Sequence, residues 1–133
     1  MKKRVAFVCV QNSCRSQMAE AWAKTLGKGK TEVYSAGTEE YPFIKPRAVQ
    51  VMAEVGIDMS GQHPKRLEDI PESFDVLITM GCHAECAYVP AEHREDWNLD
   101  DPSGKPLEAF RETRDLTKEK VAGLLRRIEK GEL

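Results

Sequence analysis

A chain of 133 residues, 41% hydrophobic and 32% charged, has the composition of one soluble globular domain spanning residues 1–133. The net charge is −2 and there is no basic block, which argues against nucleic acid as a partner. No apolar stretch is long enough to span a membrane, so we expect no membrane association.

The first apolar run, residues 5–10, follows Lys2, Lys3 and Arg4 and superficially imitates a secretory signal. It is too short for the apolar core of a signal peptide, and no small-residue cleavage site follows it. We therefore predict a cytoplasmic protein, with a monomer as the expected state. Four cysteines in a reducing compartment indicate redox catalysis or metal binding rather than permanent disulfides.

Residues 5–16 predict a strand that leads through a tight polar loop into a helix. The backbone N–H groups of the loop and the helix N-terminus would converge on one point, where the helix dipole favours negative charge. Arg15 adds a guanidinium that suits a tetrahedral oxyanion. We therefore predict an oxyanion site formed by Val10, Gln11, Asn12, Ser13, Cys14 and Arg15.

Cys9 ends the strand and shares this electropositive environment, which favours its thiolate and makes it a candidate nucleophile. A plainer interpretation makes Cys9 a buried strand residue and Arg15 a surface residue. We favour the nucleophile because strand, cysteine, loop, arginine and helix follow each other in register. Cys14, inside the loop, fits a packing role as well as a redox role.

Apolar periodicity predicts three helices. The first covers residues 17–26 and would include Leu26 in its buried stripe. The second runs from residue 46 to residue 56 and would face Ala53 inward. A long C-terminal helix opens at Pro106, with apolar positions repeating at spacings of three and four.

Further strands are predicted at residues 32–36, 74–80 and 94–97, while residues 57–73 have the composition of a surface loop. Helices between apolar strands indicate an α/β fold with a parallel sheet. Carboxyl ends of parallel strands lie along one edge of such a sheet, where ligands bind. Cys9, Ser35, Cys82 and Asp101 should therefore converge.

The Cys-x5-Arg-Ser motif ahead of a helix resembles the low-molecular-weight protein tyrosine phosphatase superfamily, which includes thioredoxin-coupled arsenate reductases. Residues 9–20, CVQNSCRSQMAE, are closer to the reductases. The resemblance continues through YSAG at 34–37 and Gly-Cys at 81–82 to Asp-Pro at 101–102, and so covers most of the chain. It implies an α/β three-layer sandwich with a central four-stranded parallel sheet.

The resemblance also implies reduction of arsenate to arsenite for arsenic detoxification. In that scheme Cys9 attacks arsenate, Ser16 donates a hydrogen bond to its thiolate, and Asp101 acts as general acid. Cys82 then attacks the Cys9–arsenic adduct, arsenite leaves, and Cys86 attacks Cys82 to free Cys9. Thioredoxin would reduce the Cys82–Cys86 disulfide, with glutaredoxin or glutathione as the alternative reductant, and phosphate or sulfate would mimic arsenate.

Two other interpretations stay open at this point. A tyrosine phosphatase would use the same nucleophile, arginine and acid, but it leaves Cys82 and Cys86 without a role. Phosphatases usually carry aromatic residues after Asp-Pro, where this chain has Ser103 and Gly104. A metal-binding module would use Cys82, His83, Cys86 and His93, a weak match to structural zinc spacings.

The identity of the general acid and the binding of a potassium ion also have alternative interpretations. Asp101 fits a turn aspartate before proline, and Asp100 is the neighbouring candidate for the acid. Some relatives bind potassium near the loop through side chains that match Asn12, Glu20 and Ser35. Their aspartate falls near Lys65 here, whose ammonium could replace the ion, so we predict neither a metal nor a cofactor.

Overall fold

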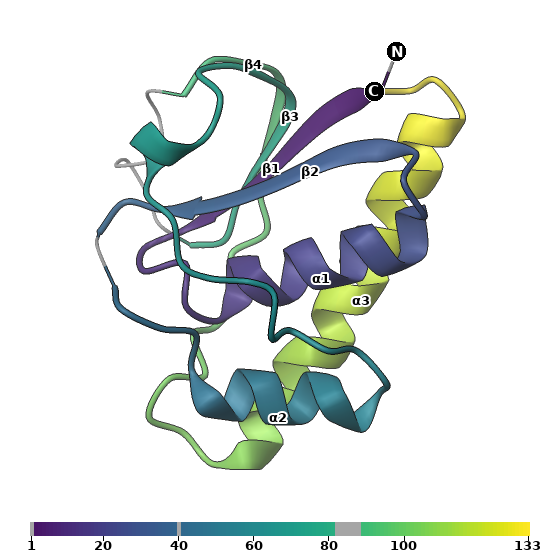
Figure 1. Ribbon diagram of the computed structural model, residues 1–133. Coiled ribbons are helices and arrows are strands. Elements are labelled where there is room, and N and C mark those ends of the chain that lie inside the picture. The colour runs from purple at the N-terminus through teal and green to yellow at the C-terminus, as the bar shows by residue number, and fades with distance from the viewer. Residues whose placement is uncertain (1, 40, 82–88) are drawn as a thin grey trace.

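The computed structural model describes residues 2–39, 41–81 and 89–133. The elements follow in the order β1 (Lys3–Cys9), α1 (Arg15–Gly27), β2 (Thr31–Gly37), α2 (Pro46–Glu54), the 3₁₀-helix η1 (Leu67–Asp69), β3 (Phe74–Thr79), β4 (Ala91–Asp96) and α3 (Leu107–Glu129). The four strands form one parallel sheet in the order β2-β1-β3-β4, which confirms the predicted fold class (Figure 1). Cys82 and Cys86 lie outside the described residues.

The inner strands are apolar because both faces of the sheet are covered at its centre. Residues 5–9 of β1 are all buried, and so are Val76, Leu77 and Ile78 of β3. The edge strand β4 has the sequence AEHRED and is only partly buried along its length. Charged side chains along an edge strand also oppose pairing with other chains.

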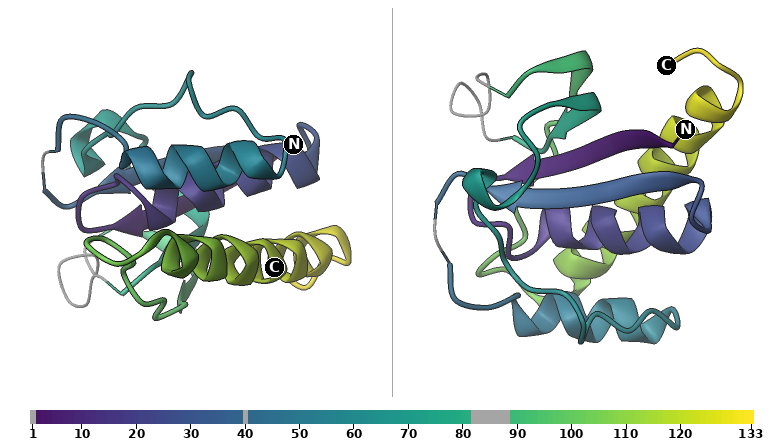
Figure 2. Two further views of the ribbon diagram at one scale, coloured as in Figure 1. Left: turned by 90° about the horizontal axis from the view of Figure 1, so that it is seen from below. Right: turned by 45° about the horizontal axis from the view of Figure 1, so that its top comes forward.

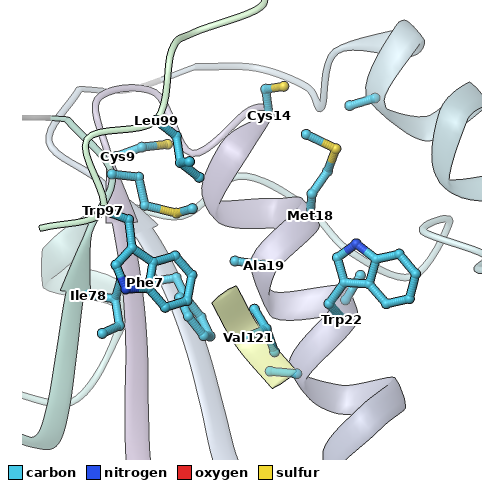
Figure 3. Packing of buried hydrophobic residues seen from close by; sticks show 14 of the residues in the cluster. Phe7, Cys9, Cys14, Met18, Ala19, Trp22, Ile78, Trp97, Leu99 and Val121 are labelled. Atoms are coloured by element: carbon cyan, nitrogen blue, oxygen red, sulfur yellow. The ribbon is translucent and has the colours of Figure 1, made fainter. Parts of the chain in front are cut away.

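Helices α1 and α3 pack against one face of the sheet, and α2 packs against α3 farther from the strands (Figures 1 and 2). The core between sheet and helices includes Phe7 and Trp97, whose ring centroids are 5.7 Å apart, together with Met18 and Trp22 of α1 (Figure 3). A smaller apolar cluster on the opposite face includes residues of η1 and the loop around it. Cys9 lies at one end of the larger core.

Three details differ from the sequence-based predictions. Leu26 is 36% exposed, because eight residues at 100° each carry it well away from the direction of Met18. Ala53 is also exposed, since α2 turns Ala48, Val51 and Met52 toward the core instead. The fourth strand begins earlier than predicted and ends before Trp97, which packs on Phe7.

The register of the sheet aligns the strand ends that matter for the site. Cys9 pairs with Gly37 of β2, and the preceding Val8 pairs with Thr79 of β3, which in turn pairs with Asp96 of β4. The carboxyl ends of all four strands therefore meet at one edge, on the left in Figure 1. Within the described part of the chain, no helix is long and apolar enough to cross a membrane.

Candidate active site

The sulfur of Cys9 lies under the loop that joins β1 to α1. The backbone N–H of Asn12 donates a hydrogen bond to Cys9 Sγ over 3.2 Å, and Ser16 Oγ lies 2.9 Å from the same sulfur. Cys9 is only 3% exposed and Ser16 is fully buried. The loop therefore wraps around the sulfur, and two polar groups are in contact with it.

Asn12 braces the loop. Its φ of +54° is left-handed, a conformation that asparagine tolerates better than most residues. The buried amide donates to Ser16 Oγ at 2.7 Å and accepts, at 2.8 Å each, from Gln17 Nε2 and from the backbone N–H of Lys65. The side chain of Asn12 thus fixes the loop from behind and does not line its mouth.

Arg15 begins α1 and connects the loop to two other strand ends. Its Nη1 donates to the carbonyl oxygen of Met80, just after β3, and to that of Leu99, 2.9 Å away and after β4. Its Nη2 lies 3.9 Å from the carboxylate of Asp101. Gly81 makes room for this arrangement, since a Cβ there would lie 3.0 Å from Nη1.

Asp101 faces the same space from the loop after β4. Partial burial raises the pKa of its carboxyl, but a hydrogen bond from Ser103 N–H at 3.0 Å and the positive charges of Arg15 and Lys45 outweigh this effect. The pKa of Asp101 therefore lies below its ordinary value. About half of its side chain is exposed, so the carboxylate can reach a molecule in the pocket.

A pocket of about 280 Å³ opens above the sulfur of Cys9. Its lining combines the nucleophile candidate, most of the predicted oxyanion loop, the arginine and the acid with two further residues: Cys9, Val10, Gln11, Ser13, Cys14, Arg15, Lys45, Asp101 and Ser103. Cys14 is buried in this wall, and burial raises the pKa of its thiol. A larger hollow near Arg4 and Asp75, at the opposite end of the sheet, has no cysteine among the described residues that line it.

Beneath the loop, Glu20 is a buried carboxylate surrounded by cations and donors. Lys65 Nζ lies 3.4 Å from its Oε1, Lys24 Nζ lies 2.6 Å from its Oε2, and Ser35 Oγ donates to Oε1. Lys65 Nζ also donates to the carbonyl oxygen of His63 at 3.0 Å. The lysine ammonium is therefore seated beside Glu20, where the sequence placed it.

Comparison with known proteins agrees with this geometry. The family model described as "Low molecular weight phosphotyrosine protein phosphatase" matches residues 4–132. The chain belongs to the low molecular weight phosphotyrosine protein phosphatase family. Among its relatives in this family, a "Glutaredoxin arsenate reductase" from Synechocystis sp. is 47% identical over 130 residues, covering 95% of this chain and 98% of the relative.

Two other similar proteins carry related names. An "Arsenate reductase" from Bacillus cereus is 40% identical over 124 residues, with 90% of this chain and 92% of the relative covered. A solved structure described as "An arsenate reductase in the phosphate binding state" superposes with a TM-score of 0.85 at 47% identity, covering 96% of this chain and 99% of the other. The resemblance inferred from the Cys-x5-Arg-Ser motif is thereby confirmed.

In this family member, the structure brings together most of the predicted site residues that it describes, while the side chain of Asn12 lies behind the loop and not in the pocket lining. Cys9, Arg15 and Asp101 line one pocket, while Ser16 contacts the cysteine from behind. Whether Cys82 and Cys86 reach this pocket stays a prediction, since they lie outside the described residues. Of the alternative metal ligands, only His93 is described, and its Nε2 lies 2.8 Å from Glu95 Oε1.

Sequence reasoning missed Lys45 and Ser103 as pocket residues. Lys45 immediately precedes Pro46, which suggested only the start of a helix. The loop before α2 folds back onto the Cys9 loop, and the N–H of Lys45 donates to Ser13 O over 2.8 Å. Nothing in the local sequence indicates that long-range hydrogen bond. Ser103 could have been found, because a residue two positions after an aspartate commonly donates to it.

Proposed function

We propose that this protein is an arsenate reductase in which Cys9 is the nucleophile. The observation that carries the proposal is the pocket itself, where the cysteine sulfur faces Arg15 and Asp101 across a space lined by the loop. The arsenate reductase names of relatives 40–47% identical support the choice of substrate. An oxyanion there would be held by loop N–H groups and the guanidinium, as at other helix N-termini.

In the proposed first step, the Cys9 thiolate attacks arsenic and a hydroxyl leaves as water after Asp101 gives it a proton. The neighbouring Arg15 and Lys45 favour ionised Asp101. A bound oxyanion offsets those positive charges and adds negative charge, which favours the protonated carboxyl. Substrate binding thus converts Asp101 into the acid that the step requires.

The second step must supply two electrons, because arsenic passes from the +5 to the +3 state. We propose that Cys82 attacks Cys9 Sγ, the sulfur–arsenic bond breaks with its electron pair on arsenic, and arsenite departs. A Cys9–Cys82 disulfide then carries the oxidation. Attack of Cys86 on Cys82 returns Cys9 as a thiolate and leaves a Cys82–Cys86 disulfide for an external dithiol or glutathione.

We propose thioredoxin as the reductant. We also propose that the protein acts in the cytoplasm, where reduction of arsenate would contribute to arsenic detoxification. Glutaredoxin with glutathione is the alternative, and the name of the 47% identical relative gives it support. Both reductants deliver two electrons to a disulfide, so the choice between them depends on docking and not on the chemistry in the pocket.

Arsenate-dependent NADPH oxidation tests the proposal, with thioredoxin and its reductase in one arm and glutaredoxin, glutathione and glutathione reductase in the other. We expect turnover in at least one arm, with arsenite formed in equal amount to NADPH consumed. Absence of arsenite in both arms, from protein that still hydrolyses a small aryl phosphate, would contradict arsenate reduction and favour a phosphatase.

A further inference from the structure

Lys45 is a second cation at the pocket, and neither the family motif nor the predicted chemistry assigns it a role. It lines the same space as Cys9, Arg15 and Asp101 and lies at the N-terminus of α2. We propose that the Lys45 ammonium binds the second negative charge of the substrate, so that the pocket selects dianionic tetrahedral oxyanions over monoanionic ones. This inference rests on the proposed function.

The backbone of Lys45 is held at both of its polar groups. Its N–H donates to the carbonyl oxygen of Ser13 in the oxyanion loop at 2.8 Å. Its own carbonyl oxygen accepts from the N–H groups of Ala48 and Val49 in the first turn of α2. The residue is therefore fixed relative to the loop that would hold the anion, although it comes from a distant part of the chain.

The side chain of Lys45 is also held in position, and it is held by a neutral group. Its ammonium donates to Tyr41 Oη at 2.8 Å and lies 4.4 Å from the centroid of that ring. Within the described residues, no carboxylate lies close enough to Lys45 for an ion pair. An ammonium has three donors, and the tyrosine uses one, so others are available to an oxyanion.

The charges facing the pocket explain why a second cation matters. Arg15 can offset one negative charge of a bound oxyanion, but a dianion such as hydrogen arsenate carries two. Asp101 adds negative charge on the protein side, which opposes anion binding. Lys45 supplies a second positive charge in the lining of the same pocket.

The binding of sulfate and of phosphate can distinguish an effect of the ligand's charge from the titration of the protein's own groups. Sulfate stays a dianion between pH 5.5 and 8.5, whereas inorganic phosphate changes from monoanion to dianion across the same range. The pH dependence of sulfate binding therefore reports the protein's own titratable groups: Cys9, Cys14 and Asp101, which line the pocket, and Tyr41, which contacts Lys45. The difference between the phosphate and sulfate profiles reports the ligand's charge.

We expect Lys45→Met to weaken sulfate and dianionic phosphate by about tenfold, measured by calorimetry, because a charge-assisted hydrogen bond in a half-exposed pocket is lost. Monoanionic phosphate should bind as before, so the rise in phosphate affinity with pH should flatten. Lys45→Arg should restore most of the difference. Lys130→Met removes the same charge at the far end of α3 and should change neither profile, and Tyr41→Phe should keep dianion affinity within about twofold.

Each remaining outcome is decisive. Wild-type affinities in Lys45→Met would overturn the inference, as would an equal loss for monoanion and dianion. If wild-type protein reduces arsenate while Lys45→Met binds both dianions normally, only the role of Lys45 fails. If wild-type protein binds neither phosphate nor sulfate and reduces no arsenate, the proposed function fails and the inference fails with it.

Discussion

At the scale of single residues, the site divides into a sulfur, an acid and the groups that hold them. Cys9 is buried, whereas Asp101 is half-exposed and accepts a hydrogen bond from the Ser103 N–H near the positively charged Arg15. That contrast suits their proposed tasks. A nucleophile must keep one position through every turnover, while an acid must exchange its proton with solvent between turnovers.

Replacing Cys9 by serine should abolish both arsenate reduction and aryl phosphate hydrolysis, because the thiolate starts both reactions in the proposed mechanism. The coupled NADPH assay and release of a chromogenic phenol measure the two activities. Cys14→Ser is the matched control, since it removes a thiol from the same pocket and should leave aryl phosphate hydrolysis within a few-fold of wild type. Near wild-type arsenate turnover in Cys9→Ser would refute the whole site assignment.

Asp101→Asn should lower kcat for aryl phosphate hydrolysis by about 10²-fold or more, the usual contribution of a general acid. It should also bind phosphate at least as tightly as wild type, since a negative charge facing the anion is removed. In wild type, kcat should fall as pH rises through the pKa of Asp101 in the complex. That alkaline fall should be missing from the pH–rate profile of Asp101→Asn, and an unchanged profile would point to Asp100 or another acid.

At the scale of elements, the close approach of β2 to the Cys9 loop decides the shape of the site. A Cβ at Gly37 would lie 2.7 Å from the carbonyl carbon of Gln11 and from Val10 O, and 2.8 Å from Asn12 N. Real Cβ atoms do not come so close to backbone. Gly37 is therefore required by space, at the strand end that pairs directly with Cys9.

Gly37→Ala should lower the free energy of unfolding by about 1–3 kcal/mol, as overpacking usually does. Because the displaced atoms belong to the oxyanion loop, phosphate affinity should fall as well. Urea unfolding and calorimetry measure the two effects. Gly61→Ala is the control, since no described heavy atom beyond its own neighbours lies within 4 Å of a Cβ there. Equal behaviour of the two variants would contradict the argument.

The buried Glu20 links α1, β2 and the loop that carries Lys65. Burial, the largest effect, raises its pKa, but hydrogen bonds from Lys24 and Ser35 and the charge of Lys65 lower it below the ordinary 4.5. A carboxyl whose pKa is lowered by folding stabilises the fold above its unfolded pKa. That contribution is lost as pH falls through the folded pKa.

Lys65→Met should therefore lower the free energy of unfolding by about 1 kcal/mol at neutral pH, because a charged hydrogen bond to a buried group is lost. The difference from wild type should shrink as pH falls well below 4.5. Lys24→Met removes a lysine that is 54% exposed, against 19% for Lys65, and should cost less despite its shorter contact. A larger loss of unfolding free energy in Lys24→Met than in Lys65→Met would show that solvent exposure does not decide which of the two lysines stabilises the fold more.

At the scale of the whole molecule, the sequence predicted what local signals determine. The strand, loop and helix around Cys9 and Arg15 follow from apolar periodicity and a motif, and their convergence with Asp101 follows from the rules of parallel sheets. Lys45 could not be predicted, since its place depends on a loop folding back over a long distance. The bounds of β4 were missed because an edge strand with the sequence AEHRED lacks a clear apolar alternation.

In the proposed mechanism, hydrolysis of a phosphate ester and reduction of arsenate share Cys9 but differ in their need for Cys82. We therefore expect that a substitution can remove one activity and leave the other. The described part of the pocket brings together Cys9, Arg15 and Asp101, the residues that hydrolysis of a phosphate ester would use, whereas Cys82 lies outside the described residues. Cys82→Ser should therefore keep aryl phosphate hydrolysis within about threefold while losing arsenate reduction, since only the latter needs a second thiol. Peptide mapping of wild type after one turnover without reductant should find a Cys82–Cys86 disulfide. Parallel loss of both activities would make Cys82 structural.

The guanidinium of Arg15 has a consequence for how the protein survives in the cell. It fastens the Cys9 loop to the chain beyond β3 and beyond β4, so the proposed anion site depends on the assembly of those strands. Folding and occupancy are then thermodynamically linked: an anion present at 100 times its Kd stabilises the native state by about 2.7 kcal/mol. Bound cellular phosphate would therefore stabilise the native protein and protect it from proteolysis when arsenate is absent.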